Sequence, residues 1–283
     1  MEPKNLKQGD QSQTDLPKIF DSTQQQIIEQ KYLTIESVLE EAKGKGDVVL
    51  LKDHQIFYLV LNRGDNSFNP PFIQLIHDKL DEVEQSQGPA CLVSIGANEK
   101  LFSSGLDVKY KKATQNYGFE LPYQMQHLLN RILLLPIPTL SVINGSALAG
   151  GLMYALAHDF RIMKSEKSYI SLSELTYNVT IPPAFAALIK YQLQPQTVRL
   201  MIYGGKYKGS QALKLKVVEK LYKDNQQLMN YVQLFRKEFA QFGSENRREA
   251  LMENKKNIHA QISKVVEKVP GVTLGRFSNG VKL

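Results

Sequence analysis

The chain has 283 residues, of which 42% are hydrophobic and 22% charged, an ordinary composition for a globular protein long enough to bury a core. The single cysteine, Cys91, excludes an internal disulfide, and its apolar neighbours are typical of a buried thiol rather than a nucleophile. No apolar stretch approaches the roughly 18 residues that a membrane span requires. The net charge of +7 suits an anionic ligand, but the lysines are scattered, so we expect no nucleic-acid partner.

The first 46 residues form a polar extension. Residues 1–22 are rich in Gln, Lys and Asp and are predicted to be disordered or loosely attached. Residues 22–43 repeat apolar side chains at helical spacing, and Gly44-Lys45-Gly46 ends the pattern. We expect residues 1–46 to carry one amphipathic helix, which packs on the main domain or on a partner protein.

From residue 47 onward, strand and helix patterns alternate. Two apolar runs, 48–51 and 56–61, flank a polar tripeptide and predict a hairpin. Asn69-Pro70-Pro71 then predicts the start of an amphipathic helix. The further strands are predicted at 90–95, 139–143 and 160–163, and the helices at 72–83, 123–135 and 149–158. This order is typical of an α/β core with a mostly parallel sheet, which we place at residues 47–205.

The C-terminal part shows only helical patterns after residue 183. They cover 184–191, 196–203, 210–215, 225–242 and 245–269. We therefore expect residues 206–283 to form a helical region that follows the α/β core.

Two turns rich in small residues join a strand to a helix. The first, residues 101–108, opens a helix at Asp107, whose carboxylate is suited to cap it. The second, residues 144–153, has small residues that let a ligand approach the backbone closely. Two clusters of outward-facing amides in one α/β domain are the parts of an oxyanion hole.

These two turns resemble the motifs of the crotonase (enoyl-CoA hydratase/isomerase) superfamily. The matching residues are Phe102–Asp107, with the pattern F-x-x-G-x-D, and Asn144–Gly151, followed by Asp159 after the helix. Ala155–Asp159 and the Ser173-Glu174-Leu175 segment are most similar to the plant-type peroxisomal Δ3,Δ2-enoyl-CoA isomerases. The resemblance covers residues 47 to roughly 220. It implies a spiral of ββα units closed by C-terminal helices, assembled as a homotrimer or homohexamer.

The resemblance also implies a set of site residues. The backbone N–H groups of Leu106 and Gly150 would form the oxyanion hole. Glu174 matches one of the two glutamates of the family's hydratases, whereas the other position holds Met153. One carboxylate beside an enolate pocket suits a proton shift from C2 to C4 and does not suit the addition of water. The implied activity is an enoyl-CoA isomerase that acts on acyl-CoA without a cofactor or metal.

Further substrate contacts are expected from residues around this site. Ser104, Asp107 and Met153 belong to the matching motifs, and Lys256 lies on a late basic helix that could contact the phosphates of coenzyme A. The histidines show no metal-ligand spacing, and His158, on the apolar helix, is expected to be packed rather than catalytic.

The alternative interpretation is a crotonase fold that has lost catalysis and serves as a scaffold or assembly subunit. Ala149 interrupts the glycine triplet, Tyr177–Thr180 replaces the usual glycine-bearing loop, and the N-terminal extension has no place in the core family. Binding of acyl-CoA would discriminate between the two.

The C-terminus, Val281-Lys282-Leu283, is close to a peroxisomal address and favours the peroxisome, with the cytoplasm as the alternative and the mitochondrion still open.

Overall fold

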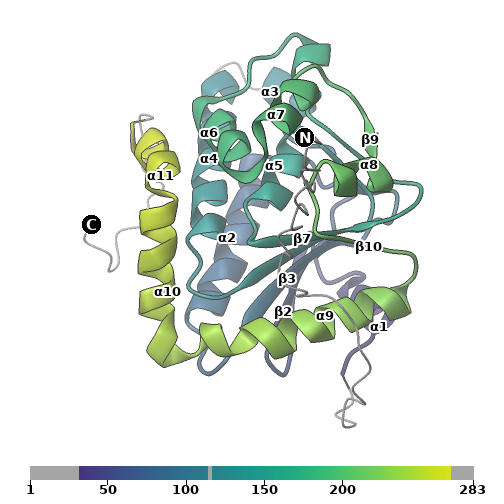
Figure 1. Ribbon diagram of the computed structural model, residues 1–283, viewed down its shortest axis with the longest axis vertical. Helices are drawn as coiled ribbons and strands as arrows, with labels where there is room; N and C mark the ends of the chain where they lie inside the picture. The colour runs from purple at the N-terminus through teal and green to yellow at the C-terminus, as the bar shows by residue number, and fades with distance from the viewer. Residues whose placement is uncertain (1–31, 114–116, 269–283) are drawn as a thin grey trace, which may run out of the picture.

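The computed structural model describes residues 32–113 and 117–268, which form two sheets surrounded by helices (Figure 1). The six-stranded sheet has the order β1 (Val48–Asp53), β2 (Ile56–Leu61), β3 (Cys91–Gly96), β5 (Thr139–Ile143), β7 (Phe160–Lys164), β10 (Lys220–Tyr222). The four-stranded sheet has the order β4 (Leu101–Ser103), β6 (Ser146–Leu148), β8 (Tyr169–Ser171), β9 (Tyr207–Lys208). Only the β1–β2 and β8–β9 pairs are antiparallel.

The chain moves between the two sheets in a repeating order. A strand of the larger sheet is followed by a short strand of the smaller sheet and then by helix, for β3–β4, β5–β6 and β7–β8 in turn. The helical parts that follow are α3 (Val108–Ala113) and α4 (Tyr117–Leu133), then α5 (Gly150–Leu156), then the 3₁₀ turn η1 (Leu175–Tyr177) and α6 (Pro183–Gln192). The expected spiral of ββα units is confirmed.

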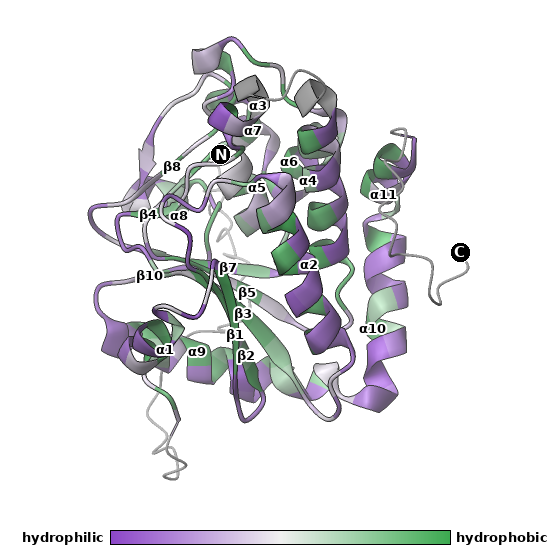
Figure 2. Cartoon of the chain, turned by 180° about the vertical axis from the view of Figure 1, so that it is seen from behind, coloured by the Kyte–Doolittle hydropathy of each residue, from purple (hydrophilic) through white to green (hydrophobic). Residues whose placement is uncertain are grey.

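Both faces of the larger sheet are buried, as is typical of parallel sheets. All residues of β2 are buried; Leu59 packs in the cluster with α2 (Pro70–Glu84), α4 and α5, and Tyr58 packs in the cluster on the other face. That second face is covered by α1 (Ile35–Ala42) and α9 (Asn225–Phe239), as Figures 1 and 2 show. The sheet is therefore a rigid support for the turns at its edge.

The N-terminal helix α1 is shorter than predicted and belongs to the core. Thr34 is extended and its Oγ1 accepts the N–H of Ser37 at 3.1 Å, so the helix begins at Ile35. Before it, the Leu33 N–H donates to Asp53 at 2.9 Å. Val38 is fully buried, so the apolar face of α1 is used within the chain. The rest of the predicted extension, residues 1–31, lies outside the described residues.

The prediction of helices alone after residue 183 is wrong. Strands β9 and β10 lie beyond residue 205 and join one sheet each, so both sheets continue across the boundary expected there. The strands β4, β6, β8, β9 and β10 are too short to produce an alternating pattern in the sequence. The single helix predicted at 245–269 is two helices, α10 (Glu245–Ile258) and α11 (Ala260–Glu267), which are separated at His259.

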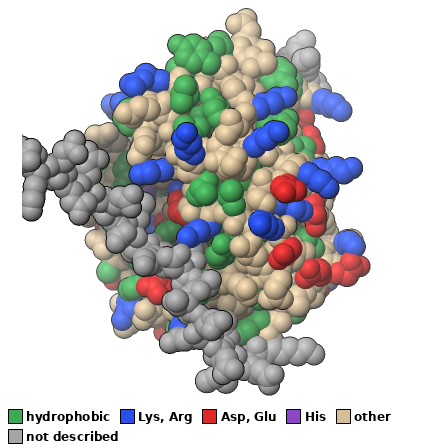
Figure 3. Space-filling model, turned by 45° about the vertical axis from the view of Figure 1, so that its right-hand side comes forward, with side chains coloured by type: hydrophobic (Ala, Val, Ile, Leu, Met, Phe, Trp, Pro, Cys, Tyr) green, Lys and Arg blue, Asp and Glu red, His purple; other side chains and the backbone are tan. Residues whose placement is uncertain are grey.

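The other helices agree with the predicted ones to within a few residues. They are α7 (Pro195–Met201), α8 (Gly209–Lys214) and α9, which is followed by the 3₁₀ turn η2 (Ala240–Gly243). At the start of α2, the Asn69 side chain accepts the N–H of Phe72 at 3.1 Å, as its motif indicates. No helix in the described ranges combines the length and the apolar character needed to cross a membrane. On the face in Figure 3, Lys and Arg side chains are scattered.

The turn between β6 and α5 contains a strained residue. Ala149 has φ 45° and ψ −119°, a conformation that glycine adopts readily and that a residue with a Cβ rarely adopts. Its N–H donates to Ser171 O at 2.9 Å, and its carbonyl accepts the N–H of Met153 at 3.1 Å. These bonds hold the turn and so determine how Gly150 enters the helix.

Replacing Ala149 with glycine should stabilise the fold by about 1 kcal/mol, because the relief of backbone strain exceeds the entropic cost of glycine. Urea unfolding and thermal melting measure the change. Ala155→Gly, within the helix α5 that follows this turn, is the control and should destabilise by about 1 kcal/mol or more. Equal destabilisation by both substitutions would show that Ala149 is not strained.

Candidate active site

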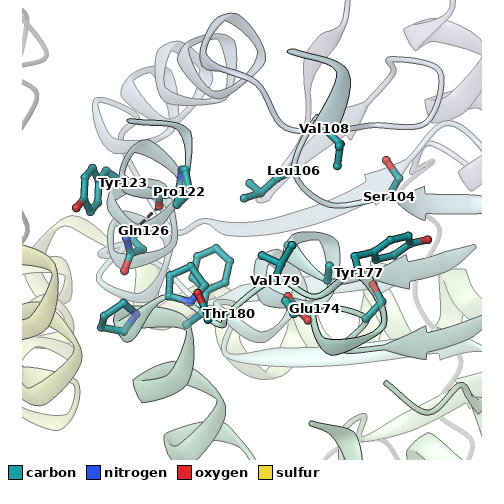
Figure 4. A pocket seen from close by; sticks show the side chains of 16 residues that line it. Ser104, Leu106, Val108, Pro122, Tyr123, Gln126, Glu174, Tyr177, Val179 and Thr180 are labelled. Carbon is teal, nitrogen blue, oxygen red and sulfur yellow. Dashed lines mark hydrogen bonds between the residues drawn. The ribbon is translucent and has the colours of Figure 1, made fainter. Parts of the chain in front are cut away.

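A cavity of about 440 Å³ lies between the segment after β4, the start of α5 and the segment after β8. Its wall is mainly apolar, with Leu106, Val108 and Phe185 among the lining side chains. In Figure 4, Leu106 and Val108 face Val179 across the cavity, and residues of α4 close one end. The wall is therefore suited to hold an apolar chain.

The first turn places the N–H of Leu106 at this cavity. Leu106 forms an isolated parallel bridge with Phe68, in which the Phe68 N–H donates to Gly105 O at 2.7 Å and the Asp107 N–H donates to Phe68 O at 2.8 Å. Because successive amides of an extended segment point to opposite sides, the Leu106 N–H points away from Phe68. No acceptor for it is found among the described residues.

The second turn brings the N–H of Gly150 next to that of Leu106. A Cβ on Gly105, whose φ is +95°, would lie 2.9 Å from Gly150 N, so the two turns pack backbone against backbone. A Cβ on Gly150 would lie 3.3 Å from Leu106 N. The Gly150 N–H likewise has no acceptor in the described part of the chain. The structure thus brings together the two donors that the sequence predicted.

Glu174 lies in the same wall and is 8% exposed. Its Oε2 is buried and has no hydrogen-bond partner in the ranges that the structure describes. Burial raises the pKa of this carboxyl, since desolvation disfavours the charged form. A carboxyl of this kind can accept and return a proton nearer to neutral pH than an exposed one.

The three groups share one structural origin. Leu106, Gly150 and Glu174 each follow a strand of the smaller sheet, β4, β6 and β8, and these strands are neighbours paired in parallel. The carboxyl ends of parallel strands lie at one edge of a sheet, where ligands commonly bind in α/β proteins. The geometry of the smaller sheet therefore assembles the site.

Of the expected substrate contacts, Ser104 lines the cavity and Asp107 does not. The Ser104 hydroxyl donates to Asp65 at 2.8 Å. Asp107 caps α3, where its Oδ1 accepts the N–H of Tyr110 at 2.9 Å, and its Oδ2 accepts from Asn69 at 3.1 Å. The carboxylate of Asp107 thus caps the helix, as predicted, and holds the turn in place, and it lies outside the cavity wall.

Met153 and Lys256 also lie away from the cavity wall. Met153 is fully buried in the core, where it belongs to the apolar cluster that α5 shares with α2 and α4. Lys256 lies on α10 and pairs with Glu253 at 2.7 Å on the surface. Its neighbour Lys255 is buried and pairs with Asp159 at 2.7 Å. Neither lysine lines the cavity.

One end of the cavity is made by residues that the sequence motifs do not include. Gln126 of α4 donates to Pro122 O at 3.1 Å and accepts the Ala184 N–H at 3.0 Å, which ties α4 to the start of α6. Tyr123 and Phe185 line the same end. In the sequence, the available signal for Gln126 was a polar residue on the apolar face of the helix predicted at 123–135.

His158 is packed in the core, as expected, and does not line the cavity. Its Nδ1 donates to Tyr154 O at 2.9 Å and its Nε2 accepts from Ser94 at 2.8 Å. Burial lowers the pKa of His158 to about 4, so the imidazole is neutral at pH 7.

Comparison with known proteins was made on both sequence and structure. The sequence profile of the Enoyl-CoA hydratase/isomerase family matches residues 52–275. Enoyl-CoA delta isomerase 2, peroxisomal, of Arabidopsis thaliana is 27% identical over 187 residues, 63% of this chain and 78% of the relative. Enoyl-CoA delta isomerase 3 of the same plant is 30% identical over 178 residues, 60% of this chain and 74% of the relative.

The solved structures that resemble this chain are enoyl-CoA hydratases and related proteins. A probable enoyl-CoA hydratase of Mycobacterium tuberculosis superposes with a TM-score of 0.70 at 20% identity, covering 79% of this chain and 93% of that one. An enoyl-CoA hydratase/isomerase family protein of Pseudomonas syringae gives a TM-score of 0.71 at 21% identity, covering 78% and 95%. At such identities these structures establish the crotonase fold. Fold and sequence profile together show that this chain belongs to the enoyl-CoA hydratase/isomerase family.

Proposed function

We propose that the chain is an enoyl-CoA isomerase, which moves the double bond of a 3-enoyl-CoA to the 2-position. Acyl-CoA is the substrate, and the proposed step uses no metal or cofactor. The observation that carries the proposal is the cavity wall: among its lining residues in the described ranges, Glu174 is the sole carboxylate, and its Oε2 is unpaired. The names of the Arabidopsis relatives agree with this activity.

The proposed mechanism is a proton shuttle by one group. Ionised Glu174 removes a proton from C2, and the electron pair moves toward the thioester oxygen, which becomes an enolate. The N–H groups of Leu106 and Gly150 donate to that oxygen and stabilise the charge as it develops. Protonated Glu174 then returns its proton to C4, so the double bond reforms between C2 and C3. Its raised pKa makes the protonated form less costly.

Hydration of the double bond is less well supported than isomerisation. By resemblance to the family, hydratases use a second glutamate at the position of Met153. Here Met153 is apolar and fully buried in the core. A water molecule beside Glu174 would therefore lack the partner that orients it.

The sequence features that favour a scaffold leave the arrangement of the site residues intact. Ala149 takes the conformation that glycine would take, at a cost in strain, and Gly150 stays beside Leu106. Tyr177, Val179 and Thr180 line the cavity in place of a glycine-bearing loop. An apolar cavity with two unpaired donors and an unpaired carboxyl favours an enzyme over a scaffold.

Location and assembly are further parts of the proposal. The name of one Arabidopsis relative places that protein in the peroxisome, and we propose the same location for this chain. The tripeptide Val281-Lys282-Leu283 lies outside the described residues. A homotrimer or homohexamer is proposed by resemblance to the family.

The substitution Glu174→Gln should lower kcat for conversion of 3-enoyl-CoA at least about 100-fold, because the amide cannot accept a proton. Binding of a saturated acyl-CoA, followed by calorimetry, should change by no more than a few-fold, since the amide keeps the size of the side chain. Hydration of 2-enoyl-CoA is assayed in parallel. A variant with near wild-type turnover would remove Glu174 from the mechanism, and substantial hydration by the wild type would contradict the isomerase proposal.

The same variant should alter how stability depends on pH. The pKa of Glu174 in the folded state lies above its unfolded value near 4.5, so the wild type loses stability as the pH rises through the range between these values. Glu174→Gln should therefore be more stable than wild type at neutral pH, and the difference should disappear below the unfolded value. Urea unfolding from about pH 4 to 8 measures this. Glu253→Gln, which alters an exposed ion pair, should show almost no difference.

The substitution Gly150→Ala should separate stability from activity. Alanine favours the helix by up to about 1 kcal/mol, and the close contact of its methyl with the backbone of Gly105 opposes that gain, so the melting temperature should change little. The added methyl would lie 3.3 Å from Leu106 N and obstruct the oxygen site, so kcat should fall at least about 10-fold. A stable variant that keeps full activity would show that the two amides do not hold the thioester oxygen.

A further inference from the structure

The position of the Leu106 amide depends on a neighbouring loop, residues 62–69. Residues 104–107 belong to no helix or strand; their only ladder contact in the described part of the chain is the bridge to Phe68. The Ser104 N–H donates to Asp65 O at 3.0 Å, beside the bonds that Gly105 and Asp107 make to Phe68. Loop 62–69 therefore positions residues 104–107, the segment that carries the Leu106 N–H.

Asn66 is the most deeply held residue of that loop. It is fully buried and has φ 50°, in the left-handed region that asparagine tolerates better than most residues. Its Nδ2 donates to Phe102 O at 2.9 Å, and its Oδ1 accepts the Arg63 N–H at 2.8 Å. The side chain therefore fastens the loop to strand β4 and also holds the loop's own turn.

The backbone carbonyl of Asn66 continues the connection toward the cavity. It accepts the hydroxyl of Ser103 at 2.7 Å, and the same Ser103 oxygen accepts the Gly105 N–H at 3.1 Å. Ser103 also sets the approach of α5, since a Cβ on Gly151 would lie 2.8 Å from Ser103 Oγ. One buried serine thus adjoins both the residue before Leu106 and the residue after Gly150.

We infer that Asn66 is a positioning residue, which through Ser103 holds the amides of Leu106 and Gly150 at the separation that binds an enolate oxygen. Asn66 does not line the cavity, so it acts through these neighbours and does not touch the substrate. The inference rests on the proposed function. Displacement of such donors by about 1 Å can cost on the order of 100-fold in rate, so a residue that fixes their separation influences kcat strongly.

The test is Asn66→Gly, which permits the left-handed backbone and removes both side-chain hydrogen bonds. We expect kcat to fall about 10- to 100-fold and KM to change less than about 3-fold, because the enolate gains more from the two donors than the ground-state thioester does. The matched control is Lys167→Gly, an exposed residue with φ 59° in the turn before β8, which should keep kcat within about 2-fold. A folded Asn66→Gly variant with wild-type kcat would overturn the inference.

A second probe reports on the oxygen site without turnover. Acetoacetyl-CoA, a β-ketoacyl thioester, absorbs at longer wavelength as an enolate than as the neutral form. The wild type should increase the enolate band on binding, and Asn66→Gly should lose much of that increase while still binding the thioester. A purely structural role would leave the band of the folded variant unchanged.

Three further outcomes are distinguishable. If Asn66→Gly does not fold, Ser103→Ala removes the linking hydroxyl and should lower kcat and the enolate band in the same way; unchanged values would overturn the inference. If the wild type lacks isomerase activity but forms the enolate band, and the variants lose it, then the isomerase proposal fails and the positioning role of Asn66 stands. Absence of the band in the wild type would overturn both.

Discussion

The close backbone contact between the turn after β4 and the turn before α5 is the constraint on which the site depends. A Cβ on Gly151 would lie 2.6 Å from Ser103 O, and one on Gly105 would lie 2.9 Å from Gly150 N. Side chains at these positions would push the turns apart and separate the Leu106 and Gly150 amides. The glycines are thus required by the distance between two backbones, and the pair of donors results from that contact.

The rest of the fold keeps this contact in place. The larger sheet is buried between helices on both faces. Along the chain, its strands β3, β5 and β7 are each followed by a short strand of the smaller sheet. Because β4, β6 and β8 lie side by side in parallel, the segments that follow them must meet at one edge. A buried carboxyl and two unpaired amides from distant parts of the sequence then line one apolar cavity.

His158 in the core and the polar groups of the cavity wall differ in their hydrogen bonding. In the core, His158 is neutral and both of its ring nitrogens are paired, so its burial needs no further partner. In the cavity wall, Glu174 Oε2, Leu106 N–H and Gly150 N–H are left unpaired among the described residues. Unpaired buried polar groups cost stability, and a ligand in this apolar cavity could supply hydrogen-bond partners to these three.

Much of the site could be predicted from the sequence, because its motifs are local. Gly105 and Gly150 stand in short sequence patterns that can be recognised without the fold, and the longer helices and strands show clear periodicity. The sequence alone thus determined the family resemblance, the two donors and the candidate carboxyl.

Only the tertiary structure decided which neighbouring residues serve the cavity. It placed Asp107 outside the cavity wall, Met153 in the core and Lys256 on the surface, and it brought in Gln126 and Asn66. The reason is physical: strands of two or three residues leave no periodic signal, and burial or a hydrogen bond to a residue far away in the chain depends on how those strands pair.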